Sequence, residues 1–475
     1  MVLRTIQSFI PIIVFFYTSS CAGKTHQNVA KNDAAPMSSA VSAPAKDTFE
    51  TGKIISPVYC QNDASKSYAL YIPANAKSES LPVIYFFDPH GSGTFPLSKY
   101  KSLADRYGFI FIGSNNSKNG NDLATAEKIW AILSTDTKAR LHINENRIYC
   151  CGFSGGGKVA CYVAMQHPEV KGVIANSGAL PELTTSNFHF SITAIAGEGD
   201  MNMTDLVAIT NELDKTTARH RIIFFDGKHE WAPEATMDIA ITGLQLDAMH
   251  DRLISADMHF IGNFIINTEA KIDADIKAGN YLKAANECKL FASLLDADSI
   301  KEAKSIREKA VAITSNPAYQ QQLKQKQDLL VKEQSWKDQF NEKFGTADIN
   351  YWETTINDFQ RRAKKQTADG AMYQRLLAYL SLAFYSISNQ LIATNRNQDA
   401  QHFVELYKMV DPTNTEAWYF SAILDARNNN VRAAESDLMT AVSNGFTDKD
   451  RMRQQAEFKN ISVNFSGIES KMKTN

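Results

Sequence analysis

The chain has 475 residues, and its 50 Lys and Arg side chains almost balance its 52 Asp and Glu side chains, for a formal net charge of −2. Near neutrality argues against a nucleic-acid-binding protein, because neutralising phosphates requires a basic excess on some face. A hydrophobic share of 44% and a charged share of 21% exclude a wholly disordered chain. Six cysteines are too few for a disulfide scaffold. Length alone suggests about three domains.

Residues 1–20 resemble an export signal. Arg4 precedes an apolar run from Phe9 to Tyr17, which is too short to span a bilayer as a stable helix but suits the hydrophobic region of a secretory signal. Small residues then lead to Cys21, as in bacterial lipoproteins, although Thr18 stands where leucine is usual. The pattern predicts a lipoprotein signal peptide with lipid attachment at Cys21. A plain cleaved signal and a retained anchor are the alternatives.

Residues 21–50 are rich in Ala, Ser, Lys, Asn and Pro and show no apolar periodicity, which predicts a flexible tether. Ala22 rather than aspartate follows the cysteine, which in a Gram-negative bacterium resembles the pattern of lipoproteins that are sorted to the outer membrane. We therefore expect a protein of the cell envelope, on the periplasmic side of the outer membrane or at the cell surface. The lipid anchor would be its only contact with the membrane.

Residues 51–255 alternate between short apolar runs and helix-like stretches. Continuous apolar strands joined by helices are typical of an α/β fold with a mainly parallel sheet covered on both faces. No helix separates Val58 from Tyr68, so this first pair of strands is expected to form an antiparallel hairpin. The expected strands are 67–73, 82–88, 108–114, 146–152, 171–177, 190–197 and 220–227, and the expected helices are 122–140, 156–167, 204–218 and 233–253.

The sharpest motif is G-x-S-x-G, which spans Gly152 to Gly156 between an expected strand and an expected helix. A tight turn from strand to helix strains the backbone of the central residue, requires small neighbours and leaves the Ser154 hydroxyl exposed. The N-terminus of the following helix offers unpaired N–H groups to a developing oxyanion, the first of them at Gly155. These features predict Ser154 as a nucleophile. A glycine-rich turn without chemistry is the alternative.

A serine nucleophile needs a base, and the base needs an orienting carboxylate. Asp200 and His229 each follow an expected strand, at the edge of the sheet where sites in α/β proteins assemble. The chain order Ser, Asp, His is that of α/β-hydrolases. We predict His229 as the base and Asp200 as the acid, with Glu198 and Asp205 as alternatives to Asp200.

A second oxyanion donor is expected in the sequence Asp-Pro-His-Gly-Ser-Gly, which runs from Asp88 to Gly93 after a buried strand. A His-Gly pair in this position resembles the oxyanion loop of esterases, where glycine lets the backbone approach the reacting carbonyl closely. We predict a backbone N–H at Gly91 or Ser92 as the donor. His90 is expected to fix the loop rather than act as a base.

Together, these motifs resemble an α/β-hydrolase of the putative-esterase and polyhydroxybutyrate-depolymerase type, which includes feruloyl esterases. The resemblance covers residues 54–250 and rests on DPHGSG, GFSGGG, AGEGD and DGKHEW. It implies a serine hydrolase of carboxylic esters that uses no metal and no organic cofactor. The block departs from the family in being short, with little room for a helical lid, which suggests an open site. The expected substrates are esters linked to polysaccharide, polyesters or lipid-like esters.

Residues 256–475 show no strand signals and long amphipathic stretches, which predict an α-helical domain. Ala400 and Ala433 repeat at nearly the 34-residue period of tetratricopeptide repeats. The region therefore resembles tetratricopeptide-type helical hairpins over 381–445 and, more weakly, over 268–298, with a general helical bundle as the alternative. Such a surface suits a protein or peptide partner. The tryptophans at helical spacing, Trp336, Trp352 and Trp418, are expected in the core.

Apart from Cys21, the cysteines are expected to be buried free thiols, because no pair has the spacing of zinc ligands and Cys packs as a small hydrophobe. The sequence thus predicts an exported serine esterase. Two rival functions use the same features. One is a serine peptidase with the same triad. The other is an inactive hydrolase fold that serves a helical binding protein.

Overall fold

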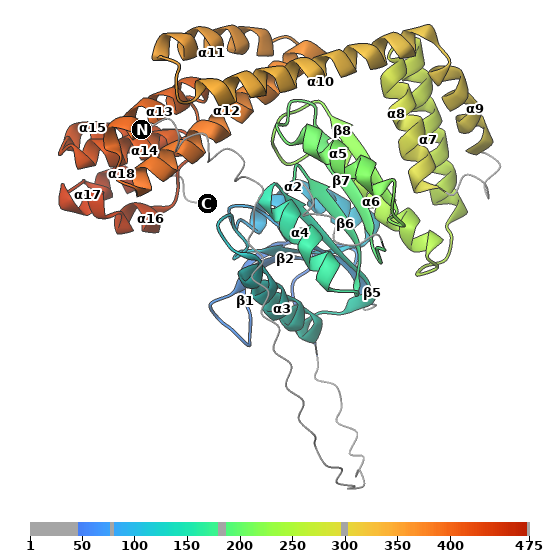
Figure 1. Cartoon of the computed structure of the whole chain (residues 1–475). Coiled ribbons are helices and arrows are strands. Elements are labelled where there is room, and N and C mark those ends of the chain that lie inside the picture. The colour runs from blue at the N-terminus through green and yellow to red at the C-terminus, as the bar shows by residue number, and fades with distance from the viewer. Residues whose placement is uncertain (1–45, 77–79, 179–186, 296–302, 473–475) are drawn as a thin grey trace, which may run out of the picture.

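The computed structural model describes residues 46–76, 80–178, 187–295 and 303–472. A sheet domain lies below a run of helices that arch over it (Figure 1). The expected signal, Cys21 and most of the tether lie outside the described residues. This part of the sequence analysis therefore stays a prediction.

The sheet has eight strands in the order β1-β2-β4-β3-β5-β6-β7-β8. β2 pairs antiparallel with both β1 and β4, and the remaining neighbours are parallel. This arrangement confirms the predicted mainly parallel α/β-hydrolase sheet and its antiparallel hairpin. The strands are β1 (Ile54–Tyr59), β2 (Ser67–Tyr71), β3 (Leu81–Phe87), β4 (Ile110–Ser114), β5 (Ile143–Phe153), β6 (Val170–Asn176), β7 (Ser191–Gly197) and β8 (His220–Phe225).

Helices cover both faces of this sheet, which is why its central strands are apolar throughout. α3 (Leu123–Arg140) and α4 (Gly155–Gln166) bury one face, and α2 (Thr94–Tyr107) and α6 (Glu234–His250) bury the other. α5 (Met203–Leu213) packs against β7 and β8. α2 is absent from the sequence prediction. Pro96 lies in its first turn, and its inner face, around Leu97 and Tyr100, is fully buried.

The five described cysteines are buried and unpaired, as expected. Cys150 and Cys151 are adjacent in β5 and lie in hydrophobic clusters on opposite faces of the sheet, and Cys161 lies over the first of them. Burial raises the pKa of both Cys60 and Cys288 to about 11, so these groups are neutral thiols at physiological pH. They act as packing residues.

Three helices after the sheet share its hydrophobic core: α7 (Met258–Lys277), α8 (Tyr281–Leu294) and α9 (Ala303–Thr314). Ile265 and Phe291 of these helices belong to the same buried cluster as Ile223 and Phe225 of β8. Residues beyond 255 thus complete the covering of one sheet face. The long helix α10 (Pro317–Lys343) then crosses above the sheet domain (Figure 1).

A second, separate hydrophobic cluster lies in the C-terminal helices. These are α11 (Ile349–Ala363), α12 (Ala368–Ala393), α13 (Asn397–Val410), α14 (Thr415–Arg427), α15 (Val431–Ser443), α16 (Lys449–Gln454), α17 (Ala456–Asn460) and α18 (Phe465–Glu469). Among the described residues, α12 alone is long and apolar enough to cross a membrane by composition. Its buried side chains, such as Leu380 and Phe384, lie at the centre of this cluster. Trp352 is fully buried there, whereas Trp336 and Trp418 are partly buried.

The helices α12 to α15 form two successive hairpins with a recurring backbone feature. Asn395 and Asn429 both adopt a left-handed conformation, with φ of 57° and 58°, at the turn inside each hairpin. They are 34 residues apart, and the buried alanines Ala400 and Ala434 follow each turn at the same spacing. The turn and the small residue therefore repeat together. The assignment to tetratricopeptide repeats stays a prediction.

Candidate functional site

Ser154 stands between the last residue of β5 and the first residue of α4, with φ of 54° and ψ of −119°. A positive φ is uncommon for a residue with a side chain and indicates a strained backbone. The strain is held by packing and by the Ser154 N–H, which donates to the Asn176 carbonyl oxygen at 2.9 Å. The nucleophile position predicted from the motif is thus the strained residue at the start of a helix.

The glycines of the motif are required by close backbone contacts. A Cβ at Gly152 would lie 2.0 Å from the Gly156 carbonyl oxygen, and a Cβ at Gly156 would lie 1.9 Å from the Phe87 carbonyl oxygen. Neither backbone oxygen can yield without moving its strand or helix. The sequence pattern is therefore a packing requirement of the turn that presents Ser154.

A continuous chain of hydrogen bonds joins the three predicted triad residues. His229 Nε2 lies 2.9 Å from Ser154 Oγ, and His229 Nδ1 lies 2.9 Å from Asp200 Oδ1. Asp200 is fully buried, and its Oδ1 also accepts the Asn202 N–H at 2.9 Å. The His229 ring packs on Phe153, with centroids 4.8 Å apart. The arrangement suits proton transfer from the serine hydroxyl to the imidazole.

The two alternative acids lie away from the imidazole. Glu198 has an exposed side chain, and its main-chain carbonyl accepts a hydrogen bond from Arg375. Asp205 is exposed in the first turn of α5. Within the described residues neither carboxylate hydrogen-bonds His229. The geometry thus brings Asp200, and neither alternative, to the base.

The predicted oxyanion loop lies beside the turn that carries Ser154. The Asn119 N–H donates to the Pro89 carbonyl oxygen at 2.7 Å, and Asn119 Oδ1 would be 2.0 Å from a Cβ at Gly155. Asn119 thus lies against the predicted donor Gly155. Sequence reasoning missed it, because it stands in a polar loop without a motif.

The three predicted N–H donors differ in what they already bond. The Gly91 N–H donates to the Asp88 carbonyl oxygen at 3.0 Å within a tight turn, where Gly91 has φ of 72°. Its N–H is therefore engaged inside the loop. Ser92 and Gly155 make no turn, loop or cap hydrogen bond through their N–H groups in the described part of the chain. The roles of Ser92 and Gly155 as oxyanion donors stay predictions.

Asp88 joins the predicted oxyanion loop to the loop that carries His229. Its Oδ2 accepts the Trp231 indole N–H at 2.8 Å, and its Oδ1 lies 3.3 Å from His90 Nδ1. Burial disfavours the Asp88 carboxylate, but hydrogen bonds from His90 and Trp231 outweigh it and hold the Asp88 pKa below its usual value. The hydrogen bond to Asp88 raises the pKa of His90, with a smaller contribution from the charge of Glu416. The His90 ring thus contacts Asp88 within its own loop, and its role in fixing that loop stays a prediction.

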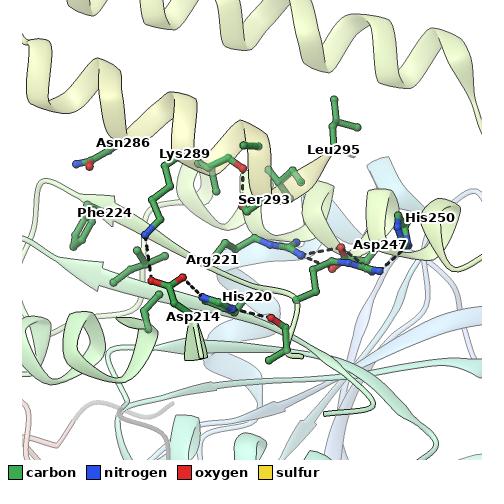
Figure 2. Close-up of a pocket in the computed structure, with 17 residues that line it drawn as sticks. Asp214, His220, Arg221, Phe224, Asp247, His250, Asn286, Lys289, Ser293 and Leu295 are labelled. Carbon is green, nitrogen blue, oxygen red and sulfur yellow. Dashed lines mark hydrogen bonds and ion pairs between the residues drawn. The ribbon is translucent and has the colours of Figure 1, made fainter. Parts of the chain in front are cut away.

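A cavity of about 460 Å³ lies elsewhere, where α8 meets β8, and contains none of the predicted site residues. Figure 2 shows Lys289 reaching from α8 toward Asp214, at 3.8 Å. Beside them, Arg221 Nη2 donates to both carboxylate oxygens of Asp247 at 2.8 Å (Figure 2). These charged side chains pair with one another at the junction between the sheet and the helices. Among the described residues, no group of three His, Cys, Asp or Glu side chains could hold a metal ion.

Comparison with known proteins finds a match to the Dienelactone hydrolase family over residues 119–238. The matched segment contains Ser154, Asp200 and His229 and runs from the loop before α3 into α6. No curated protein matches the chain.

Similar solved structures include an esterase from Pyrobaculum calidifontis. It is 13% identical, and the match covers 44% of this chain and 88% of that chain, with a TM-score of 0.34. Esterase from Rhizomucor miehei is 13% identical, and the match covers 41% of this chain and 84% of that chain, with a TM-score of 0.34. Acylaminoacyl peptidase from Pyrococcus horikoshii is 14% identical, and the match covers 38% of each chain, with a TM-score of 0.31.

Proposed function

We propose that the chain is a serine hydrolase that cleaves carboxylic esters through an acyl-enzyme. The observation that carries this proposal is the chain of hydrogen bonds from Ser154 through His229 to the buried Asp200. It occurs at a strained turn at the start of α4, and the predicted donors Ser92 and Gly155 make no turn, loop or cap hydrogen bond through their N–H groups in the described chain. The Dienelactone hydrolase match over the same residues supports it.

In the first half-reaction, His229 Nε2 takes the hydroxyl proton of Ser154 while Oγ forms a bond to the ester carbonyl carbon. The Gly155 and Ser92 N–H groups and the N-terminus of α4 stabilise the oxyanion. Asp200 holds the imidazole with its proton on Nδ1 and stabilises the imidazolium. The tetrahedral intermediate then expels the alcohol, which takes the proton from Nε2, and the acyl group stays on Ser154.

In the second half-reaction, His229 Nε2 takes a proton from water, and the resulting hydroxide attacks the acyl carbon. The same N–H groups bind the oxyanion. The carbon–oxygen bond to Ser154 then breaks, Oγ recovers the proton from Nε2, and the carboxylic acid leaves. No other reactant is consumed.

The substrate class within carboxylic esters is tested with a panel of p-nitrophenyl, aromatic acyl, polyester and acetylated polysaccharide substrates. We expect hydrolysis of short p-nitrophenyl esters, which react on any exposed triad. Amides of matched acyl groups test the peptidase alternative. Cleavage of peptide amides that Ser154→Ala abolishes would favour the peptidase alternative, even if matched esters react faster, because esters are the more reactive substrates on any such triad.

A fluorophosphonate probe distinguishes the proposed enzyme from the inactive alternative, a hydrolase fold that serves only to bind a protein or peptide. The probe reacts with a serine that its base activates. We expect labelling of the wild-type protein and none of Ser154→Ala. A folded wild-type protein that takes no label would favour the binding role.

We extend the proposal to a cell-envelope lipoprotein anchored through Cys21, on the strength of the sequence of residues 1–21. Radiolabelled palmitate fed to a Gram-negative host that expresses the full chain tests it. Incorporation into the wild type and its loss in Cys21→Ala is the expected result. Equal labelling of both proteins, or of neither, would contradict lipid attachment at this residue.

A further inference from the structure

A buried arginine of the helical region reaches the turn that carries the triad acid. Arg375, on α12, donates from Nη1 to the main-chain carbonyl oxygen of Glu198, which is two residues before Asp200. Arg375 and Glu198 are 177 positions apart in the chain. α10 and α12 pack together above the sheet domain (Figure 1). The Glu198 carbonyl that Arg375 contacts directly follows β7, which ends at Gly197.

The guanidinium is held rigidly on its other side. Arg375 Nε and Nη2 donate to Glu333 Oε2 of α10 at 2.8 and 2.6 Å. The side chains of Arg375 and Glu333 are 5% and 2% exposed. Lys337 Nζ lies 3.0 Å from the second oxygen of Glu333. The planar fork of arginine suits this geometry, because it bonds a carboxylate and a carbonyl at once.

A buried ion pair is weak evidence for stability, since its desolvation offsets much of its attraction. The informative feature is therefore the hydrogen bond that Arg375 Nη1 donates outside the ion pair, to the Glu198 carbonyl oxygen. The main-chain carbonyl of Glu198 lies in a turn between β7 and α5, and no side chain of that turn bonds it in the described structure.

A second residue of α12 contacts the same turn. A Cβ at Gly199 would lie 2.3 Å from Gln374 Oε1, so the turn approaches α12 as closely as glycine allows. Gln374 is itself fixed, because its Nε2 donates to the Ala363 carbonyl oxygen at 2.9 Å. Two consecutive side chains of α12 thus contact the two residues immediately before Asp200.

The turn that contains Glu198 and Gly199 also hydrogen-bonds the loop that carries His229. The Glu198 N–H donates to the Phe225 carbonyl oxygen at 2.9 Å, and the Gly199 N–H donates to the Gly227 carbonyl oxygen at 2.8 Å. Gly227 is two residues before His229. A displacement of this turn would therefore move the acid and the base relative to Ser154.

We propose that Arg375 is a positioning residue for hydrolysis: through the Glu198 carbonyl, it fixes the turn that places Asp200 against His229. The helical region is then part of the catalytic unit. This inference rests on the proposed serine hydrolase function, because it assigns a task within that triad.

The test removes the donor together with its ion-pair partner. Lys337, which also pairs with Glu333, keeps its charge and has a side chain that is 15% exposed. Arg375→Met together with Glu333→Met keeps the volume, and replacing a buried pair by apolar residues is often neutral for folding. The matched control is Arg427→Met with Glu457→Met. Arg427 Nη1 donates to the Ile392 carbonyl oxygen at 2.9 Å and its Nη2 to Glu457 Oε1 at 2.8 Å, and these partners all belong to the helical region.

We expect the Arg375/Glu333 variant to lose about tenfold to 100-fold in kcat, with KM within about twofold, because small displacements of positioned groups cost on this order. The Arg427/Glu457 variant should keep its kcat. Arg375→Lys should lose less than the double variant. The lysine ammonium can still donate a hydrogen bond, but its single nitrogen cannot reproduce the arginine fork that bonds Glu333 and the Glu198 carbonyl together. Equal kcat in the two double variants, both folded by circular dichroism, would overturn the inference.

Hydrogen exchange gives a readout independent of activity. The backbone amides of residues 198–203 should exchange faster in the Arg375/Glu333 variant than in the wild type. In the Arg427/Glu457 variant they should exchange at the wild-type rate. Unchanged exchange in both variants would also overturn the inference. Absence of ester hydrolysis and of fluorophosphonate labelling in the wild type would instead refute the proposed function, and the exchange experiment would still decide whether Arg375 fixes the turn.

Discussion

The Asp200→Asn variant isolates the charge of the triad acid. Asp200 Oδ1 accepts both the His229 Nδ1–H and the Asn202 N–H, so an asparagine oxygen would stay in this place and keep the imidazole tautomer. What is lost is the negative charge beside the imidazolium. At about 4 Å and an effective dielectric constant of about 20, this attraction is about 4 kcal/mol. One factor of ten in rate corresponds to about 1.4 kcal/mol, so kcat should fall by about 10³-fold.

The assay is steady-state hydrolysis of a short p-nitrophenyl ester, with circular dichroism and urea unfolding as checks on folding. Glu198→Gln and Asp205→Asn serve as comparisons, because both side chains are exposed and neither bonds His229. We expect these two to stay within about threefold of the wild type, as surface changes usually do. A folded Asp200→Asn protein with wild-type kcat would refute the reasoning. So would a loss of the same size in Glu198→Gln or Asp205→Asn.

Three further predictions concern the loops around the nucleophile. Gly156→Ala places a Cβ 1.9 Å from the Phe87 carbonyl oxygen, so urea unfolding should show a loss of at least about 1–3 kcal/mol, and an unchanged midpoint would contradict the packing argument. Trp231→Phe leaves the buried Asp88 Oδ2 without its donor and should cost about 1–3 kcal/mol in the same assay, whereas a neutral result would deny that hydrogen bond. Because the folded pKa of Asp88 is depressed, its charge stabilises the protein above the unfolded pKa of about 3.9, and this stabilisation is lost as the pH falls toward the folded value. The difference in unfolding free energy between wild type and Asp88→Asn should therefore shrink on acidification below about pH 4, and a difference that grows there would have the wrong sign.

The three residues of the proposed triad could be predicted from the sequence because each is marked by its local surroundings. Ser154 is framed by glycines that the turn requires, and Asp200 and His229 follow apolar strands that can be recognised as strands. Since parallel strands end at one edge of the sheet, their order along the chain predicts that the three meet. The α/β sheet followed from the same apolar runs.

Features that depend on distant contacts were not accessible. The bond from Arg375 to the Glu198 carbonyl joins residues 177 positions apart and has no motif at either end. Helix α2 is a different case, because its buried residues Leu97, Tyr100 and Ala104 do recur at helical spacing, but Pro96 and the glycine-rich sequence before it favour a loop. Among the predicted oxyanion donors, Gly91 has its N–H engaged in the turn that its own positive φ makes possible, which a glycine-rich pattern does not reveal.

The central claim is that Ser154 is the nucleophile of an ester hydrolase, and its most direct measurement compares wild type with Ser154→Ala on a short p-nitrophenyl ester. Single removal of a triad nucleophile lowers kcat by about 10⁶-fold in a serine protease of known mechanism. We therefore expect loss of hydrolysis to the limit of detection in the variant, with unfolding unchanged. Equal rates of hydrolysis by the two proteins would contradict the account.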